Sequence, residues 1–353
     1  MKRLLLFTVA LAVFVSLWIH FSKITCKMVG LPTSVGPIQT DFEAPFFNKL
    51  PKSSSTNLTC QYVPVNKQGI KETYLLAYLQ RGFYDIASIR FRQVEGSDIA
   101  IAGMDLPGLP INFSSARSLS NDYSLFLGKI FQQEKFQSKI INTFVFGQQE
   151  LFCKKPIRNL DDFKGLKIRI TANQESYIAK LFNALGAKPI HIEYGETLNA
   201  LQDQLVDCGV SSYLSAESAG WFKYLPYRMN FNLGNGVNAY LINLKTWNAL
   251  NSRQKNSLTN SVNELTDDMW NYAEKAYKQS LLPCLSNEVN CKNKPELVLM
   301  SEQQLNQLQQ VAIDRVLIPW INSCEATHPG CKSSWLKAAK NNLKLQNLSL
   351  RNL

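Results

Sequence analysis

One arginine in the sequence has the chemistry to bind an organic anion. Arg169 lies in the short segment 166–170, whose alternation of apolar and charged residues is typical of a β-strand. A guanidinium group presents two parallel N–H donors that match a carboxylate, whereas a lysine offers only a point charge. The alternation places Lys167 and Arg169 on one face of the strand. Taken alone, it predicts a solvated face, because charged side chains are mostly exposed.

The eight cysteines are the second group of chemically reactive residues. Two pairs repeat one spacing and each encloses six residues with loop composition: Cys284 with Cys291, and Cys324 with Cys331. This spacing differs from the Cys-x-x-Cys pattern of redox and zinc sites. It favours either two local disulfides or one cross-link between the two loops. Cys153 and Cys208 lie in apolar stretches, so we interpret them as free thiols that pack as small apolar residues.

The sequence contains none of the common motifs of catalysis or nucleotide binding. The Gly-x-Ser-x-Gly, Walker and Gly-x-Gly-x-x-Gly patterns are absent, and the chain has only three histidines. The adjacent pairs Asp161-Asp162 and Asp267-Asp268 fit a helix start and an exposed helix face better than an acid and base couple. We therefore expect no enzymatic activity, no cofactor and no metal site.

The amino terminus has the pattern of an export signal. Met1, Lys2 and Arg3 precede an unbroken run of apolar or small residues from 4 to 19. As a helix this run would span roughly 24 Å, which is shorter than the ~30 Å hydrocarbon core of a bilayer. No small-x-small cleavage site follows it. Residues 1–27 are therefore either a cleaved signal peptide or a retained anchor. Both alternatives place the rest of the chain outside the cytoplasm, where disulfides persist.

The net charge of +11 is concentrated at the two ends of the chain. Residues 332–353 carry five basic residues and no acid, and Lys2 and Arg3 add two more, which leaves +4 for the rest of the chain. This distribution does not favour a nucleic-acid partner. Residues 333–351 interleave lysines with apolar residues. They form either an amphipathic helix on an anionic membrane or, as we favour, a helix docked on the body or a frayed terminus.

Short apolar strands alternate with helices through the body of the chain, and this pattern predicts an α/β fold. The expected strands are 84–89, 99–102, 141–146, 166–170, 189–192 and 240–243. The expected helices are 72–81, 123–136, 174–185 and 196–204, followed by the long amphipathic helices 252–281 and 301–322.

Several segments, in the right order, resemble the substrate-binding proteins of tripartite ATP-independent periplasmic (TRAP) transporters. The run DDFKGLKIR at 161–169 is similar to the family motif DLKGLKIR, and LINLKTW at 241–247 is similar to LINKKTW. Between them, Gly195-Glu196, Ala200-Leu201-Gln202 and Val206-Asp207 match a helix of the family. Upstream, Asp105-Leu106-Pro107 and Pro156-Ile157 stand where the family has DLP and RPI. The resemblance covers roughly residues 70–322.

The resemblance implies a two-domain periplasmic-binding-protein-like α/β fold with an interdomain ligand cleft and long C-terminal helices. By analogy, domain I comprises 28–147 plus 234–275. Domain II comprises 148–233 plus 276–324, and residues 325–353 form a basic C-terminal extension.

The resemblance also implies which residues bind the ligand. Arg169 stands at the position whose guanidinium clamps the ligand carboxylate in the family. Ser211 occupies the place of a family asparagine, and Gln148 or Gln149 lies nearest to a second family arginine. Further candidate contacts are Asn235, Asn238, Tyr213 and Trp221, although core packing is favoured for the two aromatic residues. Because one cation of the family pattern is missing, a monocarboxylate or a more neutral ligand is as plausible as a dicarboxylate.

The function implied is that of a periplasmic protein that captures a small carboxylate and delivers it to the membrane subunits of a TRAP permease. An uncleaved N-terminal segment would anchor it to the inner membrane. The alternative is a secreted or membrane-anchored sensory or adhesive module that keeps the fold without a transport role. Membrane contact through the N-terminal segment or the basic C-terminal helix is compatible with both.

Overall fold

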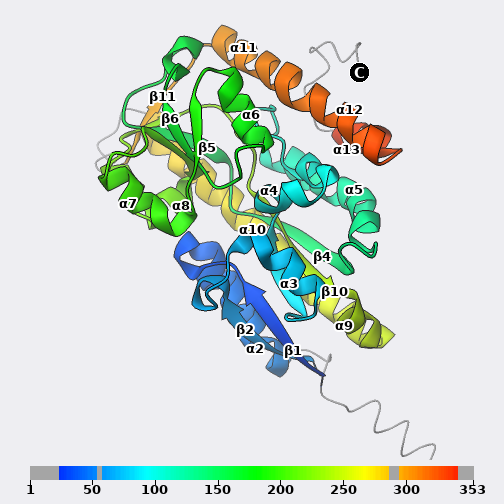
Figure 1. The fold of residues 1–353 in the computed structure, drawn as a ribbon. Coiled ribbons are helices and arrows are strands. Elements are labelled where there is room, and N and C mark those ends of the chain that lie inside the picture. The colour runs from blue at the N-terminus through cyan, green and yellow to red at the C-terminus, as the bar shows by residue number, and fades with distance from the viewer. Residues whose placement is uncertain (1–23, 54–57, 286–293, 341–353) are drawn as a thin grey trace, which may run out of the picture.

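Two β-sheets, each flanked by helices, form the body of the protein. The computed structural model describes residues 24–53, 58–285 and 294–340. Within these ranges, the strands form two separate sheets (Figure 1). One has the strand order β2-β1-β3-β10-β4 and the other β11-β9-β5-β8-β6-β7. The first sheet consists of β1 (Ile24–Gly30), β2 (Leu58–Pro64), β3 (Ile86–Arg90), β4 (Ser138–Val145) and β10 (Val237–Asn243). The second consists of β5 (Gln149–Cys153), β6 (Lys167–Ile170), β7 (Lys188–His191), β8 (Cys208–Ser212), β9 (Tyr227–Met229) and β11 (Glu296–Val298).

Helices cover both sheets. They are α2 (Ala44–Ser53), α3 (Leu75–Gln80), α4 (Phe91–Val94), α5 (Phe113–Phe131), α6 (Tyr177–Ala184), α7 (Thr197–Gln202), α8 (Tyr213–Ser218), α9 (Leu244–Ala249), α10 (Ser252–Leu285), α11 (Glu302–Ala312), α12 (Ile318–Thr327) and α13 (Cys331–Lys340). Among the helices that the structure describes, none is both long enough and apolar enough to span a bilayer. Residues 1–23 of the predicted signal or anchor segment, 1–27, lie outside the described residues, whereas 24–27 form the start of β1.

Both sheets contain parallel and antiparallel strands, and the chain passes from one sheet to the other more than once. In the first sheet β2, β1 and β3 are parallel, and β10 runs antiparallel between β3 and β4. In the second sheet β8, β6 and β7 are parallel, whereas β5 runs antiparallel to β8 and β9. The predicted two-domain α/β architecture is therefore confirmed. The exact domain boundaries stay a prediction.

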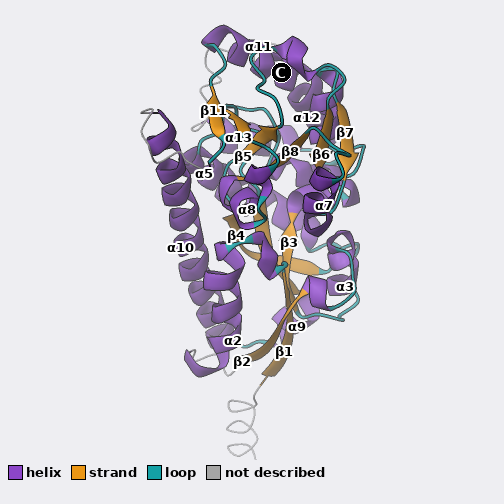
Figure 2. Ribbon diagram, turned by 90° about the vertical axis from the view of Figure 1, so that its left-hand side faces the viewer, coloured by secondary structure: helices purple, strands orange, loops and turns teal. Residues whose placement is uncertain are grey.

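The helix α10 runs alongside both sheets (Figure 2). Near its middle, Trp270 Nε1 donates to the carbonyl oxygen of Thr143 in β4 at 3.1 Å. Near its end, Ser280 Oγ accepts from Arg228 Nη1 in β9 at 3.2 Å. One continuous helix is thus bonded to a strand of each sheet.

The structure corrects one predicted strand, shifts one predicted helix and divides another. Residues 99–102 belong to a 3₁₀-helix, Ile99–Met104, because the Asp98 side chain caps it by accepting from Ala100 N at 3.0 Å. Helix α5, expected over 123–136, begins earlier, at Phe113, because Asn112 caps it, and it also ends earlier, at Phe131. The predicted helix 301–322 is divided into α11 and α12 by a π-helical turn, Ile313–Leu317.

Three disulfides join the described cysteines: Cys26–Cys60, Cys153–Cys208 and Cys324–Cys331. The local Cys324–Cys331 bridge confirms one of the predicted pairings. The interpretation of Cys153 and Cys208 as free thiols is wrong, because these residues face each other across the antiparallel strands β5 and β8. The Cys284 side chain and Cys291 lie outside what the structure describes, so that predicted pairing stays a prediction.

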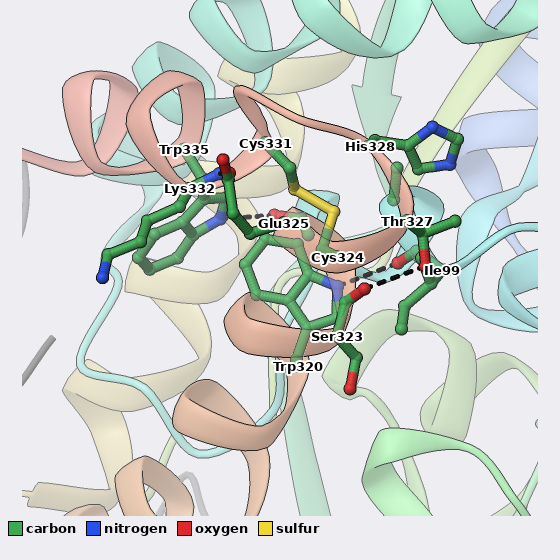
Figure 3. The surroundings of a disulfide bond; sticks show 12 residues. Ile99, Trp320, Ser323, Cys324, Glu325, Thr327, His328, Cys331, Lys332 and Trp335 are labelled. Carbon is green, nitrogen blue, oxygen red and sulfur yellow. Dashed lines mark hydrogen bonds between the residues drawn. A yellow bond between two sulfur atoms is a disulfide. The ribbon is translucent and has the colours of Figure 1, made fainter.

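The start of the basic C-terminal segment packs on the body, as favoured. In α13, Trp335 is fully buried and its Nε1 donates to the carbonyl oxygen of Gly103 at 2.9 Å. Trp320 of α12 stacks edge-on against it and donates to the carbonyl oxygen of Ile99 at 2.8 Å, beside the Cys324–Cys331 bridge (Figure 3). Residues 341–353 lie outside the described part of the chain.

Candidate functional site

Two chain crossings connect the sheets and lie side by side. The short crossing, 146–148, leads from β4 to β5, and the longer one, 230–236, leads from β9 to β10. Phe146 N donates to the Gly236 carbonyl oxygen at 3.2 Å, and Gln149 N donates to that of Gly234 at 2.7 Å. Gly234 has a φ of 113°, a conformation that glycine adopts without steric cost. The crossings therefore form a hydrogen-bonded ribbon between the two sheets.

A carboxylate fixes the second crossing from the side. Asp105 Oδ1 accepts from Asn235 N at 2.6 Å, and its Oδ2 accepts from Gly236 N at 3.0 Å. Arg92 Nη2 pairs with Asp105 Oδ2 at 3.0 Å and also donates to the Leu233 carbonyl oxygen at 2.8 Å. The DLP segment of the resemblance thus supplies a carboxylate that orders the crossing.

A small cavity of about 50 Å³ lies between the sheets, next to the crossings. The first sheet and its flanks contribute Arg90, Arg92, Val237 and Asn238 to its wall; the second contributes Gln149, Arg169, Thr171, Val210, Ser211 and Ser212. Strands β3, β6 and β8 each reach the cavity with their carboxyl ends. Ligands of open α/β sheets characteristically bind at this edge.

Arg169 is buried in the wall of this cavity, with an exposed fraction of only 1 %. Its Nε donates to the Ile192 carbonyl oxygen and its Nη1 to that of Val210, each at 3.0 Å. In the described part of the chain, Nη2 has no hydrogen-bond partner. A buried donor without a partner is costly, so this nitrogen is available for an acceptor that enters the cavity.

Aromatic rings hold the guanidinium of Arg169 in place. Its Cζ lies 5.2 Å from the centroid of Trp221 and 5.9 Å from that of Tyr194. Gly209, the register partner of Arg169 in β8, permits this packing, because a Cβ there would lie 2.9 Å from Trp221 Cζ3. Arg169 is therefore oriented before any ligand arrives.

Burial also affects the charge of Arg169. Desolvation, and then the neighbouring cation Arg90, lower the pKa of Arg169 to about 9. The side chain stays protonated at neutral pH, but its positive charge is held at a free-energy cost. An anion placed in the cavity would offset that cost.

The structure brings together four of the residues that the sequence assigned to the site. Arg169, Ser211, Gln149 and Asn238 all line the cavity. Their contact with a ligand stays a prediction.

Of the other predicted site residues, Trp221 is buried against Arg169 and three lie elsewhere. Gln148 lines a separate groove with Tyr277. Asn235 is buried in the second crossing, where its backbone N–H bonds to Asp105. The ring of Tyr213 lies 4.9 Å from Arg228 Cζ, at another pocket. Gln148 and Asn235 belong to the crossings and Tyr213 begins α8, and none of the three lines the cavity.

Sequence reasoning missed two further arginines in the cavity wall, Arg90 and Arg92. Arg90, the last residue of β3, forms an ion pair with Glu72, with 2.9 Å between Nε and Oε2. Its Cζ lies 4.9 Å from the centroid of Phe146. The family has an arginine near the position of Gln149 that this chain lacks. Arg90, from a different strand, brings a cation to the same cavity. The sequence signal that could have identified this cation is the pair Arg90 and Arg92, which directly follows the predicted apolar strand 84–89.

The comparisons with known proteins concern the family and the fold of the chain. The family of bacterial extracellular solute-binding proteins, family 7, matches residues 35–314. The chain belongs to this family. The resemblance to TRAP substrate-binding proteins is therefore confirmed, and the chain shares the extracytoplasmic class of its family.

Curated relatives of this solute-binding protein include two from Vibrio cholerae. The sialic acid-binding periplasmic protein SiaP is 25 % identical over 248 residues, covering 69 % of this chain and 74 % of SiaP. The C4-dicarboxylate-binding periplasmic protein DctP is 25 % identical over 122 residues, covering 34 % of this chain and 36 % of DctP.

Solved structures share the fold of this solute-binding protein. DctP7 of Bordetella pertussis, an extracytoplasmic solute receptor binding pyroglutamic acid, superposes with a TM-score of 0.77 at 14 % identity, over 90 % of this chain and 99 % of DctP7. A TRAP solute-binding protein of Desulfovibrio salexigens with bound orotic acid gives a TM-score of 0.75 at 17 % identity, over 90 % of this chain and 99 % of that protein.

Proposed function

We propose that this protein is an extracytoplasmic receptor that binds a small organic acid between its two sheets and delivers it to a TRAP permease. The observation that carries the proposal is the unpartnered Nη2 of buried Arg169 in the wall of the cavity. A carboxylate is the acceptor that best matches a fixed guanidinium. Membership of a solute-binding family and the acid ligands named for similar structures support the same assignment.

Binding in this proposal is a closure of two domains around the ligand. Domain I comprises 28–147 plus 234–275, and domain II comprises 148–233 plus 276–324. Arg90 belongs to the first domain and Arg169 to the second, so a ligand that contacts both would hold the cleft closed. The ribbon of the two crossings and helix α10 connect the domains, and a hinge motion there requires no covalent chemistry.

The direct test is a screen of organic acids by thermal shift, followed by calorimetric titration of each hit. We expect Arg169→Met to abolish binding of the acid that the wild type binds. We expect Arg169→Lys to weaken it by about tenfold or more, because the point charge cannot reproduce the fixed donor. Arg253→Met, at an exposed position of α10, is the matched control and should bind as the wild type does.

Two outcomes would refute the proposal: no acid stabilises the wild type, or Arg169→Met binds the confirmed acid with unchanged affinity. Delivery to a permease needs a separate observation. Genes for TRAP membrane subunits beside the gene of this protein, and loss of uptake of the bound acid when this gene is deleted, would support it. Unchanged uptake would contradict it.

A further inference from the structure

Arg90 shares with Arg169 an unusual state, that of a buried guanidinium with an unsatisfied nitrogen at the same cavity. The side chain of Arg90 is only 10 % exposed. Glu72 and the ring of Phe146 fix its orientation. Among the described residues, its Nη2 has no hydrogen-bond partner. The site therefore presents two oriented donors and not one.

The two guanidinium groups converge on one ring from opposite sheets. The Cζ atoms of Arg90 and Arg169 lie 6.0 Å and 5.9 Å from the centroid of Tyr194. The positive charge of Arg90 lowers the pKa of Arg169, so the two buried cations repel each other, and each also carries an unsatisfied donor. A ligand with acceptors for both nitrogens would satisfy the two donors together.

The charges around the cavity limit how much negative charge such a ligand can carry. Glu72 compensates Arg90, and Asp105 compensates Arg92. The hydrogen bonds of Arg169, by contrast, go to two carbonyl oxygens, not to a carboxylate. Glu193 adds a further negative charge near Arg169, on a side chain that is 26 % exposed. The site therefore favours one negative charge on the ligand over two.

We propose that Arg90 is a specificity-determining residue and that the site selects a compact monocarboxylate with an α-hydroxy or α-oxo oxygen. The carboxylate binds Arg169 Nη2, and the neutral oxygen binds Arg90 Nη2. The cavity of about 50 Å³ holds on the order of four water molecules, which suits an acid of the size of lactate. This inference rests on the proposed function, because it assumes the carboxylate on Arg169.

Alternative acids fail at one of the two arginines. A simple carboxylate such as propionate leaves the Arg90 donor unsatisfied, and an unmade hydrogen bond to a charged group costs about 1.5–3 kcal/mol, or ~10–150-fold in affinity. A short dicarboxylate such as malonate satisfies both donors but brings a second negative charge toward Glu72.

The experiment compares lactate, propionate and malonate by calorimetry on the wild type. Titration at roughly pH 8 favours the ionised form of Glu72, because burial raises the pKa of that carboxyl. We expect lactate to bind at least about tenfold more tightly than propionate and than malonate. If malonate binds best, or if only acids much larger than lactate bind, the inference is wrong.

Two variants assign the preference to Arg90. Arg90→Met alone would leave Glu72 buried without its partner, so the double variant Arg90→Met/Glu72→Gln removes both charges together. In it, we expect the ratio of lactate to propionate affinity to fall by about tenfold, with propionate affinity largely retained. Glu72→Gln alone should raise malonate affinity by about tenfold, because the opposing charge is gone. Thermal melting checks that each variant folds.

The outcomes separate this inference from the proposed function. If lactate keeps its full preference in the double variant while Arg169→Met abolishes binding, the inference fails and the proposed function stands. If Glu72→Gln does not gain affinity for malonate, the argument from charge fails as well. If no organic acid binds the wild type, both fail.

Discussion

Arg92 and Asp105 form an ion pair, 3.0 Å between Nη2 and Oδ2, at the point where the chain crosses from one sheet to the other. Both side chains are largely buried, with exposed fractions of 12 % and 5 %. The same carboxylate accepts the backbone N–H groups of Asn235 and Gly236. A single side chain thus orders the crossing that a hinge motion would bend.

The first prediction concerns this carboxylate. Asp105→Asn keeps the size of the side chain but removes the charge and one of the two acceptor oxygens. We expect it to lower the free energy of unfolding by about 2–4 kcal/mol, because Arg92 is left without its counter-charge and one buried N–H without its acceptor. Urea denaturation measures this change. Asp203→Asn, at an exposed position, should change stability by less than ~0.5 kcal/mol. Equal stability of the two variants would contradict the assigned role.

Local sequence patterns predicted the elements that carry Arg169 better than they predicted the site. Its strand was recognised from its alternation and from the DDFKGLKIR motif. Alternation alone predicted a solvated side chain, because it reveals a face of a strand but not what covers that face. The covering residues Trp221 and Tyr194 come from segments remote in sequence.

The residues that the sequence missed depend on pairings between distant segments. Arg90 lies beside Asn238 because β3 pairs with β10, and no local pattern encodes that register. The bond between Cys153 and Cys208 likewise depends on the pairing of β5 with β8. Ile99 and its neighbours have the apolar character of a strand, but a capping aspartate and the packing of Trp320 favour a 3₁₀-helix.

The second prediction concerns the close approach of Trp221 to Gly209. Gly209→Ala would place a Cβ at 2.9 Å from Trp221 Cζ3, so the indole must move. Overpacking of this kind costs about 1–3 kcal/mol of stability. Because the indole supports Arg169, we also expect acid affinity to fall by severalfold. Gly195→Ala is the control, since a Cβ there would meet no atom within 4 Å. The role of Trp221 would be refuted if Gly209→Ala bound the acid as tightly as the control.

The third prediction ranks two disulfides by the length of chain that they enclose. Cys153–Cys208 closes a loop of 55 residues and Cys324–Cys331 one of only 7. In the chain-entropy account, removing them costs roughly 4 and roughly 2 kcal/mol of unfolding free energy. Double alanine variants of each pair, compared by urea denaturation, measure the two costs. The reverse order would show that local packing, not chain entropy, dominates.

The last prediction concerns a buried carboxyl group outside the site. Glu43 is fully buried and accepts three hydrogen bonds: from Leu31 N and Tyr62 Oη at Oε1, and from Tyr240 Oη at Oε2, each at 3.0 Å. Desolvation by burial raises its pKa from 4.5 to about 7 and outweighs the lowering effect of these bonds and of the neighbouring Ser88 side chain. The folded protein therefore favours the neutral acid.

The raised pKa of Glu43 makes stability depend on pH with a definite sign. Between about pH 4.5 and pH 7 the folded state retains a proton that the unfolded chain has released, so the free energy of unfolding falls as pH rises through this window and is constant above it. Glu43→Gln mimics the neutral acid and removes this dependence. We expect the stability of the variant, relative to the wild type, to increase by on the order of 3 kcal/mol between roughly pH 4.5 and pH 8. Other titrating groups are common to both proteins and cancel in this difference. Urea denaturation at the two pH values measures it, and a difference that does not change with pH would mean that Glu43 is already ionised in the folded protein.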